Sequence, residues 1–273
     1  MERKLITILL VIVSVILVIG CVDRTGNIYK NKTDKTVTGT QIPIDGVTPS
    51  EISNKHWTYE GEEGPDNWAK LGYTECKGKE QSPVDIPSKA PIHNTGISFN
   101  YKQSILNITN NGHTIQVTYG NDSTLDVDNK TYKLLQFHFH APSEHTINGS
   151  YSDMELHLVH KSDNDGEYAV IGVMLKPGTE NIAYSQILKN LPKEKSEPQM
   201  INTVDINAVN LLPVNKSYYR YNGSFTTPPC TEGVKWFVMN NPIKLSSAQI
   251  EMFKAIYDNN YRPIQPLNKR KFN

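Results

Sequence analysis

The sequence predicts a mainly β protein of the α+β class, folded as a single domain of many short strands with a few short helices at its periphery. Short segments of alternating apolar and polar residues dominate the chain, and clusters of turn residues separate them. One late segment carries a helix start signal. With 273 residues and 37% hydrophobic content, the chain can bury a large core.

Five segments alternate in the way that a β-strand requires, because successive side chains of a strand point to opposite faces of the sheet. They span residues 105–109, 113–119, 133–140, 154–160 and 168–175. Between them lie turn clusters, of which residues 110–112 (Asn-Asn-Gly) and 162–166 (Ser-Asp-Asn-Asp-Gly) are examples.

The one clear helix signal is a capping box formed by Ser246 and Gln249. The apolar residues expected on one face of that helix are Ile250, Phe253, Ile256 and Tyr257.

Charge and composition exclude several classes of protein. The 28 Lys and Arg residues balance 28 Asp and Glu residues, so the formal net charge is zero and no nucleic-acid partner is expected. With 17 Gly, three Cys and no sustained heptads, the chain is neither collagen-like, nor a coiled coil, nor a disulfide-rich scaffold.

Residues 1–20 are typical of an export signal peptide. A charged start precedes a nearly unbroken aliphatic run from Leu5 to Ile19, and the run ends at Gly20-Cys21. This ending resembles a lipobox, in which the cysteine is lipidated and becomes the new N-terminus, so we expect a lipid anchor on Cys21. The alternative is an uncleaved membrane anchor, although the run is shorter than the roughly 20 residues that usually span a bilayer.

Both alternatives place the rest of the chain outside the cytoplasm, tethered to a cell membrane. Residues 21–53 are rich in Asn, Lys, Thr, Asp and Gly and poor in large apolar residues, which predicts a flexible tether. The packed domain is then expected over residues 54–273.

The compartment also bears on Cys76 and Cys230. An oxidising exterior favours a disulfide between them, and the alternative is a pair of free thiols.

Five of the eight histidines lie between residues 138 and 160. Strand alternation places Gln136, His138 and His140 on one face of their strand. Two imidazoles at positions i and i+2 are about 6.5–7 Å apart at Cα, so both can reach one zinc ion.

A second strand can supply a third ligand. Its alternation places His157 on one face, and the connection back to His140 is long enough for the two strands to pair as antiparallel neighbours. Three histidines leave one coordination position of zinc open, which is the catalytic arrangement. Gln136 and Glu155 lie on the ligand faces, where they can accept the second N–H of a ligating ring. The alternative is a set of hydrogen-bonded histidines on a polar sheet face.

Together these residues carry a resemblance. From about His56 to Arg262 the sequence is similar to the α-class carbonic anhydrases. The matching motifs are Gln81-Ser-Pro-Val-Asp-Ile86, Asn111-Gly-His113, Gln136-Phe-His-Phe-His140, Ser143-Glu-His145, Glu155-Leu-His-Leu-Val-His160, Gly223-Ser-Phe-Thr-Thr-Pro-Pro229 and Tyr261-Arg-Pro263. The resemblance implies a large, mostly antiparallel twisted β-sheet with short peripheral helices.

The resemblance also implies a function, which is the zinc-dependent reversible hydration of carbon dioxide to bicarbonate and a proton. His138, His140 and His157 match the zinc ligands. In this family the zinc lowers the pKa of its bound water to about 7, and the resulting hydroxide attacks carbon dioxide. Cobalt or iron stays open as the metal, since three imidazoles bind several divalent ions.

Other matched positions have implied roles around the metal. Thr226 matches the threonine that orients the hydroxide, Glu144 its carboxylate partner, and Thr227 a substrate-binding position. His113 matches the histidine that shuttles protons to solvent, and the ordinary histidine pKa of about 6.5 suits that task.

An apolar wall for carbon dioxide is implied by further matches. Its residues are Val159, Val170, Phe225, Val234 and Trp236. Phe225 departs from the leucine common in the family, and its larger ring is expected either to narrow the pocket or to redirect the substrate. Cys76 and Cys230 match the disulfide pair of bacterial-type members.

Two other functions remain open at this point. Some relatives have lost activity and serve as ligand-binding or adhesion modules, and a zinc hydrolase acting on esters would use the same hydroxide. The sequence does not distinguish a monomer from a homodimer.

Overall fold

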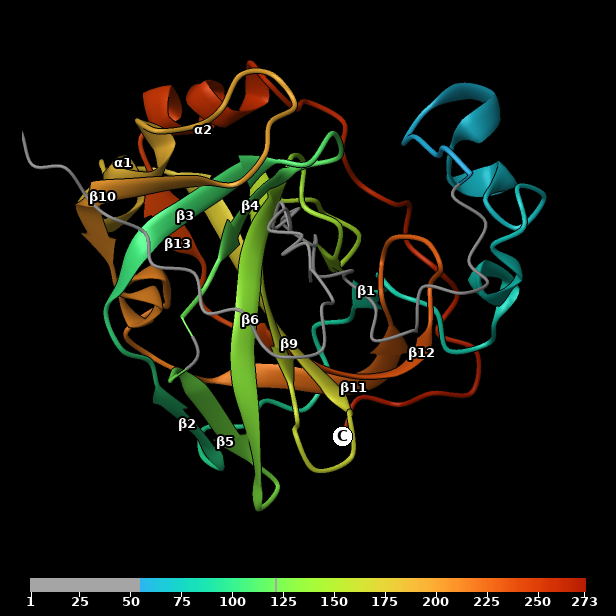
Figure 1. The fold of residues 1–273 in the computed structure, drawn as a ribbon. Coiled ribbons are helices and arrows are strands. Elements are labelled where there is room, and N and C mark those ends of the chain that lie inside the picture. Colours follow the sequence, from blue (N-terminus) through green and yellow to red (C-terminus); the bar gives the residue numbers. More distant parts are fainter. Residues whose placement is uncertain (1–54, 121) are drawn as a thin grey trace, which may run out of the picture. The chain divides into compact units, whose positions relative to one another are not determined.

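One large sheet of eleven strands runs through the centre of the domain (Figure 1). The structure, a computed structural model, describes residues 55–120 and 122–273. The predicted signal peptide, Cys21 and the predicted tether lie outside the described residues.

The strands of the large sheet are β2 (Ile97–Asn100), β3 (Ser104–Asn110), β4 (Ile115–Thr118), β5 (Thr124–Val127), β6 (Lys130–His140), β8 (Met154–Lys161), β9 (Tyr168–Pro177), β10 (Gln199–Ile206), β11 (Tyr218–Ser224), β12 (Glu232–Met239) and β13 (Ile243–Leu245). The short strands β1 (Asp85–Ile86) and β7 (Thr146–Ile147) pair in parallel as a separate two-stranded sheet. The helices are α1 (Ile182–Leu188), α2 (Ser247–Lys254) and the 3₁₀ helices Gly61–Glu63, Pro65–Asn67, Thr74–Lys77 and Ala208–Leu211.

The main strand order is β10-β3-β4-β6-β8-β9-β12-β11. Strand β5 extends the sheet from β6 and carries β2, and β13 lies alongside β9. Only the pairings of β9 with β12 and with β13 are parallel within this sheet of the described chain. The predicted fold class, one large and mostly antiparallel sheet with short helices, is confirmed.

The five segments predicted as strands all lie in the sheet, but β4 begins at Ile115 rather than at residue 113. The side-chain oxygen of Asn111 accepts hydrogen bonds from the main-chain N–H groups of His113 and Thr114, both at 2.9 Å. This turn occupies the donors that a strand would direct to its neighbour.

The capping box of α2 is present as predicted, with the Ser246 hydroxyl accepting from the Gln249 N–H at 3.2 Å. The helix ends at Lys254, so Ile256 and Tyr257 lie beyond it. Both are nevertheless partly buried against the core.

Strand β6 contains a bulge. Its register with β8 shifts between Leu134 and Gln136, so that Leu135 is an extra residue in β6. Before the bulge, Leu134 packs in the large hydrophobic core, and after it Phe137 and Phe139 pack in the same core. The extra residue therefore reverses the alternation, and from Gln136 onward the even-numbered side chains face away from that core.

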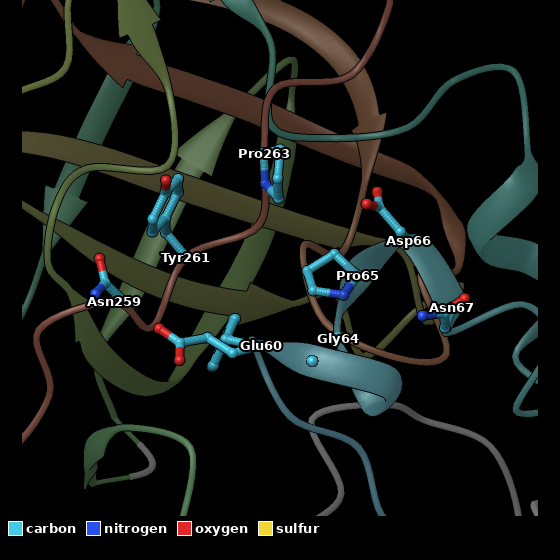
Figure 2. Close-up of a pocket in the computed structure, with 10 residues that line it drawn as sticks. Glu60, Gly64, Pro65, Asp66, Asn67, Asn259, Tyr261 and Pro263 are labelled. Carbon is cyan, nitrogen blue, oxygen red and sulfur yellow. The ribbon is translucent and has the colours of Figure 1, made fainter.

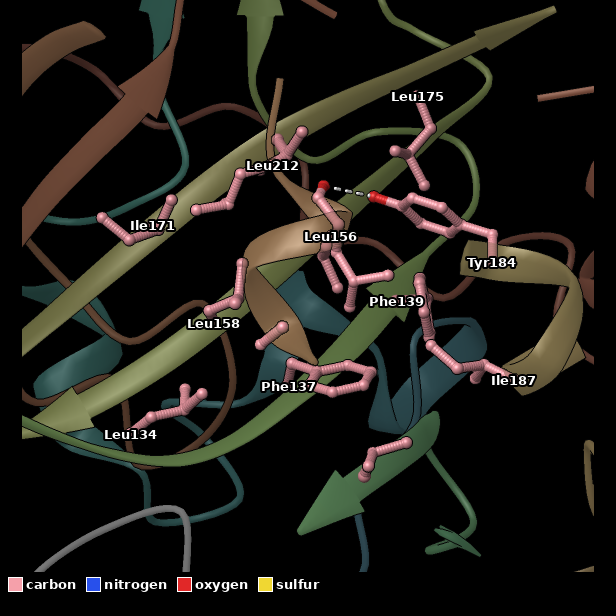
Figure 3. Close-up of a cluster of buried hydrophobic side chains, with 14 of the residues drawn as sticks. Leu134, Phe137, Phe139, Leu156, Leu158, Ile171, Leu175, Tyr184, Ile187 and Leu212 are labelled. Carbon is pink, nitrogen blue, oxygen red and sulfur yellow. Dashed lines mark hydrogen bonds between the residues drawn. The ribbon is translucent and has the colours of Figure 1, made fainter. Parts of the chain in front are cut away.

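The large core lies between one face of the sheet and the two α-helices. Figure 3 shows Phe137 and Phe139 of β6 beside Leu156 and Leu158 of β8, with Tyr184 of α1 packed against them. The Tyr184 hydroxyl donates to the main-chain oxygen of Leu211 at 2.8 Å, so its buried polar atom is satisfied (Figure 3). This core covers one face of the sheet. The polar residues described below lie on the opposite face.

The disulfide is also confirmed, since Cys76 and Cys230 are joined by an S–S bond. No helix within residues 55–120 and 122–273 combines the length and the apolar character needed to cross a bilayer.

Candidate metal centre

Three histidine rings meet on the face of the sheet opposite the large core. Because β6 and β8 pair antiparallel, His138 lies directly opposite His157, and His140 follows two residues later on the same face. One ring nitrogen from each lies within 4.8 Å of the other two. All three rings are buried. This spacing allows a single ion to contact all three rings.

Protein groups already engage the outer nitrogens of two of these rings. His138 Nδ1 lies 2.8 Å from Gln136 Oε1, and His140 Nδ1 lies 2.6 Å from the main-chain oxygen of Asn260. Each acceptor fixes the proton on Nδ1. The Nε2 atoms of both rings are therefore left with lone pairs for a metal.

The third ring is engaged through its other nitrogen. His157 Nε2 lies 3.0 Å from Glu155 Oε1, although the contact is not aligned as a hydrogen bond. Glu155 Oε1 also lies 2.8 Å from His145 Nδ1, and Glu155 Oε2 accepts the main-chain N–H groups of Glu144 and His145, each at 2.9 Å. Glu155 is thus held rigidly, and His157 turns Nδ1 toward the other two rings.

The residues fit a metal ion because the centre contains buried polar atoms without partners. His140 Nε2 and Glu144 Oε2 make no hydrogen bond and lie 3.5 Å apart. Glu144 Oε2 also lies 3.8 Å from His157 Nδ1. Unpaired buried groups of this kind cost free energy, and a cation bound by the three imidazoles removes that cost. Three nitrogen donors and one free position suit zinc.

The rings are neutral, which is the form that binds metals. Burial lowers the pKa of His138 well below its ordinary value and the pKa of His140 to about 4, and it also lowers the pKa of His157. For Glu155, burial alone would raise the pKa, but His145 and His157 hold it well below the usual value, so this group is a carboxylate.

Glu144 lies beside the rings and is itself fully buried. Its Oε1 accepts the main-chain N–H of Arg262 at 2.8 Å. Burial raises the pKa of its carboxyl to about 7, while His157, the neighbouring Thr226 hydroxyl and the Arg262 N–H act in the opposite direction. A cation among the three rings would favour the charged carboxylate further.

Thr226 and Thr227 lie in the turn that follows β11, and both are buried. The main-chain oxygen of Thr227 accepts the N–H of Cys230 at 2.8 Å, and the N–H of Phe225 donates to the oxygen of Thr231 at 3.0 Å. These bonds close the turn on itself beside the disulfide.

The expected apolar wall is one buried cluster in the structure. Its members Val159, Val170, Phe225, Val234 and Trp236 are each at most 5% exposed. The Trp236 ring lies edge-on to the His157 ring, with centroids 4.9 Å apart. Phe225 is packed edge-on to Tyr168 at 4.9 Å, so its larger ring is accommodated by an aromatic neighbour.

His113 differs from the expectation of an ordinary histidine. Its ring stacks on Trp57 with centroids 3.7 Å apart and an interplanar angle of 6°. This burial, together with electrostatic repulsion from His56 and Lys195, lowers the pKa of His113 to about 4. The sequence carried no sign of this stacking, because the two residues are far apart in the chain.

Two groups at the centre received no role from the sequence. The main-chain oxygen of Asn260 binds His140, and the main-chain N–H of Arg262 binds Glu144. The motif Tyr261-Arg-Pro263 pointed to this segment, but a side-chain pattern cannot reveal which main-chain atoms act. His145, which fixes Glu155, lies in the matched motif Ser143-Glu-His145 but likewise received no role there.

Known proteins are similar to this chain over the region that contains this centre. A family model for eukaryotic-type carbonic anhydrases matches residues 63–273. A carbonic anhydrase of Klebsiella pneumoniae is 41% identical over 231 residues, which make up 82% of this chain and 93% of that protein.

Solved structures are similar over the same region. The α-carbonic anhydrase of Thermovibrio ammonificans, solved with the inhibitor sulfanilamide, has a TM-score of 0.77 at 43% identity and covers 81% of this chain and 99% of its own. A hyperthermostable carbonic anhydrase identified from an active hydrothermal vent chimney has a TM-score of 0.74 at 48% identity, covering 80% of this chain and 98% of its own.

Proposed function

Because this chain belongs to the eukaryotic-type, or α-class, carbonic anhydrase family, we propose that it hydrates carbon dioxide reversibly at a zinc ion held by His138, His140 and His157. The observation that carries the proposal is the buried histidine trio, whose three free ring nitrogens lie within 4.8 Å of one another. Zinc, when bound, supplies a Lewis acid that lowers the pKa of a coordinated water to about 7, as in carbonic anhydrases generally.

The protein's own part begins with the orientation of the ligands. Gln136 and the main-chain oxygen of Asn260 fix the tautomers of His138 and His140, and Glu155 faces the outer nitrogen of His157. Ligands held in this way need little reorganisation when the metal binds. A metal site with such supported ligands is rigid and keeps one position open.

Thr226 and Glu144 orient the attacking solvent oxygen. When the Thr226 hydroxyl donates to the Glu144 carboxylate, its lone pairs are left to accept a hydrogen bond from that solvent oxygen. The oxygen then presents a lone pair to the carbon of the substrate. The activation barrier is lowered by this orientation and not by an additional binding contact.

Carbon dioxide is uncharged and binds best where water is excluded. The wall formed by Val159, Val170, Val234, Phe225 and Trp236 offers such a surface next to His157. In our proposal Thr227 lies at the substrate position beside Thr226, and Phe225 limits the size of the pocket.

His113 is our proposed proton shuttle to solvent. Stacked on Trp57, with its pKa lowered to about 4, it is a weak acceptor at neutral pH. Exogenous buffer should therefore contribute much of the proton transfer in this enzyme.

The test measures carbon dioxide hydration and bound zinc with and without a chelator. His140→Ala should lose stoichiometric zinc and nearly all hydration activity, because the three-ligand site becomes a two-ligand site. His160→Asn is the matched control. Like His140, His160 is a fully buried histidine, but it lies in β8 and bonds Tyr101 and Ala169 rather than facing the metal centre. The control should keep its zinc.

Other outcomes would change the proposal. Stoichiometric zinc in folded His140→Ala would contradict the ligand assignment. Tightly held zinc without hydration would favour a non-enzymatic binding module, and metal analysis showing cobalt or iron would change the cofactor. Ester hydrolysis is expected at most as a side activity.

We also propose that the protein is an extracytoplasmic lipoprotein, attached to a membrane through Cys21. The support is the apolar run that ends in Gly20-Cys21 and the polar composition of residues 21–53. Mass spectrometry of the mature membrane fraction should show a diacylglyceryl-type modification on Cys21. An unmodified Cys21, or a mature chain that retains residues 1–20, would contradict it.

A further inference from the structure

Residues 259–263 form a segment with two different faces and no regular secondary structure. Asn260 and Arg262 point inward and are each 2% exposed. Asn259, Tyr261 and Pro263 point outward and line a surface pocket of about 360 Å³ (Figure 2). On its outer side the segment faces this hollow and the Tyr151 ring, which lies edge-on to Tyr261 with centroids 5.6 Å apart, whereas its hydrogen bonds to the metal centre are all on the inner side.

Main-chain atoms of this segment orient two groups of the metal centre. The oxygen of Asn260 lies 2.6 Å from His140 Nδ1, and the N–H of Arg262 donates to Glu144 Oε1 at 2.8 Å. A shift of the segment would move both atoms together. The orientation of the ligand His140, and of Glu144, the proposed partner of Thr226, therefore depends on how the segment is anchored.

The segment has two anchors: the Asn260 side chain, which bonds the main chain at Ala141, Phe139 and His113, and the guanidinium of Arg262. Its Nη1 donates to Gln81 Oε1 at 2.8 Å and to the main-chain oxygen of Ser82 at 2.9 Å, and its Nη2 donates to the oxygen of Cys76 at 3.0 Å. The cation also lies over the Trp68 ring, 5.6 Å from its centroid. A planar guanidinium can satisfy these separate acceptors at once, which an ammonium cannot.

The groups that hold Arg262 are themselves fixed. The disulfide links Cys76 to Cys230, and Gln81 Nε2 donates to the main-chain oxygen of Cys230 at 3.1 Å. Cys230 in turn closes the turn that carries Thr226 and Thr227. Arg262, whose main chain bonds Glu144, is thus held by the disulfide and Gln81. The same groups hold the turn that carries Thr226.

We propose that Arg262 is a positioning residue, whose guanidinium fixes the main chain of residues 260–262 so that it orients His140 and Glu144. This role rests on the proposed zinc-dependent hydration. It requires no contact between Arg262 and the substrate, and it acts through the two main-chain atoms.

The test compares Arg262→Gln with Arg262→Lys and with the matched control Arg270→Gln. Arg270 also donates to several main-chain oxygens, including that of Gln81 at 2.8 Å, and lies over the Tyr221 ring, but it touches neither the ligands nor Glu144. Thermal melts and circular dichroism report folding, and two readouts report the centre: kcat/KM for hydration and the rate of zinc dissociation.

Folded Arg262→Gln should lose about tenfold or more in kcat/KM and release zinc about tenfold faster, because misplaced orienting groups affect both quantities. Arg262→Lys should recover part of each loss, and Arg270→Gln should match the wild type. Wild-type values in folded Arg262→Gln would overturn the proposal, as would an equal loss in Arg270→Gln.

If Arg262→Gln does not fold, Arg262→Lys decides alone, and wild-type kcat/KM and zinc release in that variant would overturn the role. The wild type distinguishes this failure from a failure of the proposed function. A wild-type protein that binds no zinc and hydrates no carbon dioxide removes both proposals, whereas an active wild type with unaffected Arg262 variants removes only this one.

Discussion

His113 shows how much a single neighbour changes the chemistry of a side chain. The indole of Trp57 covers one face of its ring, so the charged imidazolium loses water on that side. Electrostatic repulsion from His56 and Lys195 acts in the same direction. All of these influences favour the neutral ring.

Removing the indole should reverse the largest of these influences. Trp57→Ala is expected to raise the pKa of His113 from about 4 toward the ordinary value of about 6.5, as measured by NMR titration of the ring. Turnover in weakly buffered solution should rise with it, since a shuttle works best near the operating pH. Lys195→Gln should give a smaller upward shift, and an unchanged pKa in Trp57→Ala would show that burial by this ring is not the cause.

Between elements, charged side chains connect the β5–β6 turn to β11 and β12. Arg220 of β11 binds Asp128 through both terminal nitrogens, at 3.0 and 2.8 Å. Lys235 of β12 lies 3.7 Å from Asp128 and 2.8 Å from Glu167. Asp128 has a φ of 53°, a left-handed conformation that aspartate and asparagine tolerate better than most residues.

Asp128→Asn removes the charge while keeping this backbone conformation. It should lower the free energy of unfolding by about 1 kcal/mol at pH 7 and low salt, and by less at high salt. The Arg220 hydrogen bonds hold the pKa of Asp128 below its ordinary value of about 3.9, so its contribution is present above that pH and lost as the pH falls through the lower, folded value.

Chemical denaturation over pH and salt measures this effect. Asp163→Asn, which removes an exposed pair with Lys133, is the control and should change stability by no more than about 0.5 kcal/mol. A loss in Asp128→Asn that does not respond to salt would argue against the ionic origin.

The elements also show where sequence prediction succeeds and where it stops. Alternation over 154–160 predicted β8 and placed His157 on one face of it, because β8 contains no extra residue and pairs with β9 without a register shift. The same alternation fails for residues 133–135, since it cannot reveal the extra residue Leu135 in β6. Capping residues predicted the start of α2 but not its end, which lacks an equally local signal.

At the scale of the whole molecule, the disulfide encloses 154 residues and most of the domain. Such a long closed loop restricts the unfolded chain strongly. Reduction should therefore lower the free energy of unfolding by roughly 4–5 kcal/mol, as measured by urea denaturation with and without a reductant. A double variant with Cys76→Ser and Cys230→Ser should be less stable and insensitive to the reductant, and an unchanged midpoint for the reduced wild type would refute this expectation.

Contacts over long sequence distances are the part of the centre that the sequence could not predict. His140 and Asn260 are separated by 120 residues, and Arg262 and Glu144 by 118. Each contact uses a main-chain atom, which has the same chemistry in every residue. The ligand trio could be predicted because a strand's period orients its side chains, whereas these partners depend on how distant segments pack.

The bulge in β6 has a consequence for how this protein tolerates changes of length. Deleting Leu135 alone would restore simple alternation, with Tyr132, Leu134 and Phe137 still on the core face and His138 and His140 still on the opposite face. Deleting Phe139 instead would make His138 and His140 adjacent residues on opposite faces of the strand. Natural insertions and deletions should accordingly occur in the hairpin connections or at Leu135, and should spare residues 136–140, where the relative orientation of the two histidines depends on the number of residues between them.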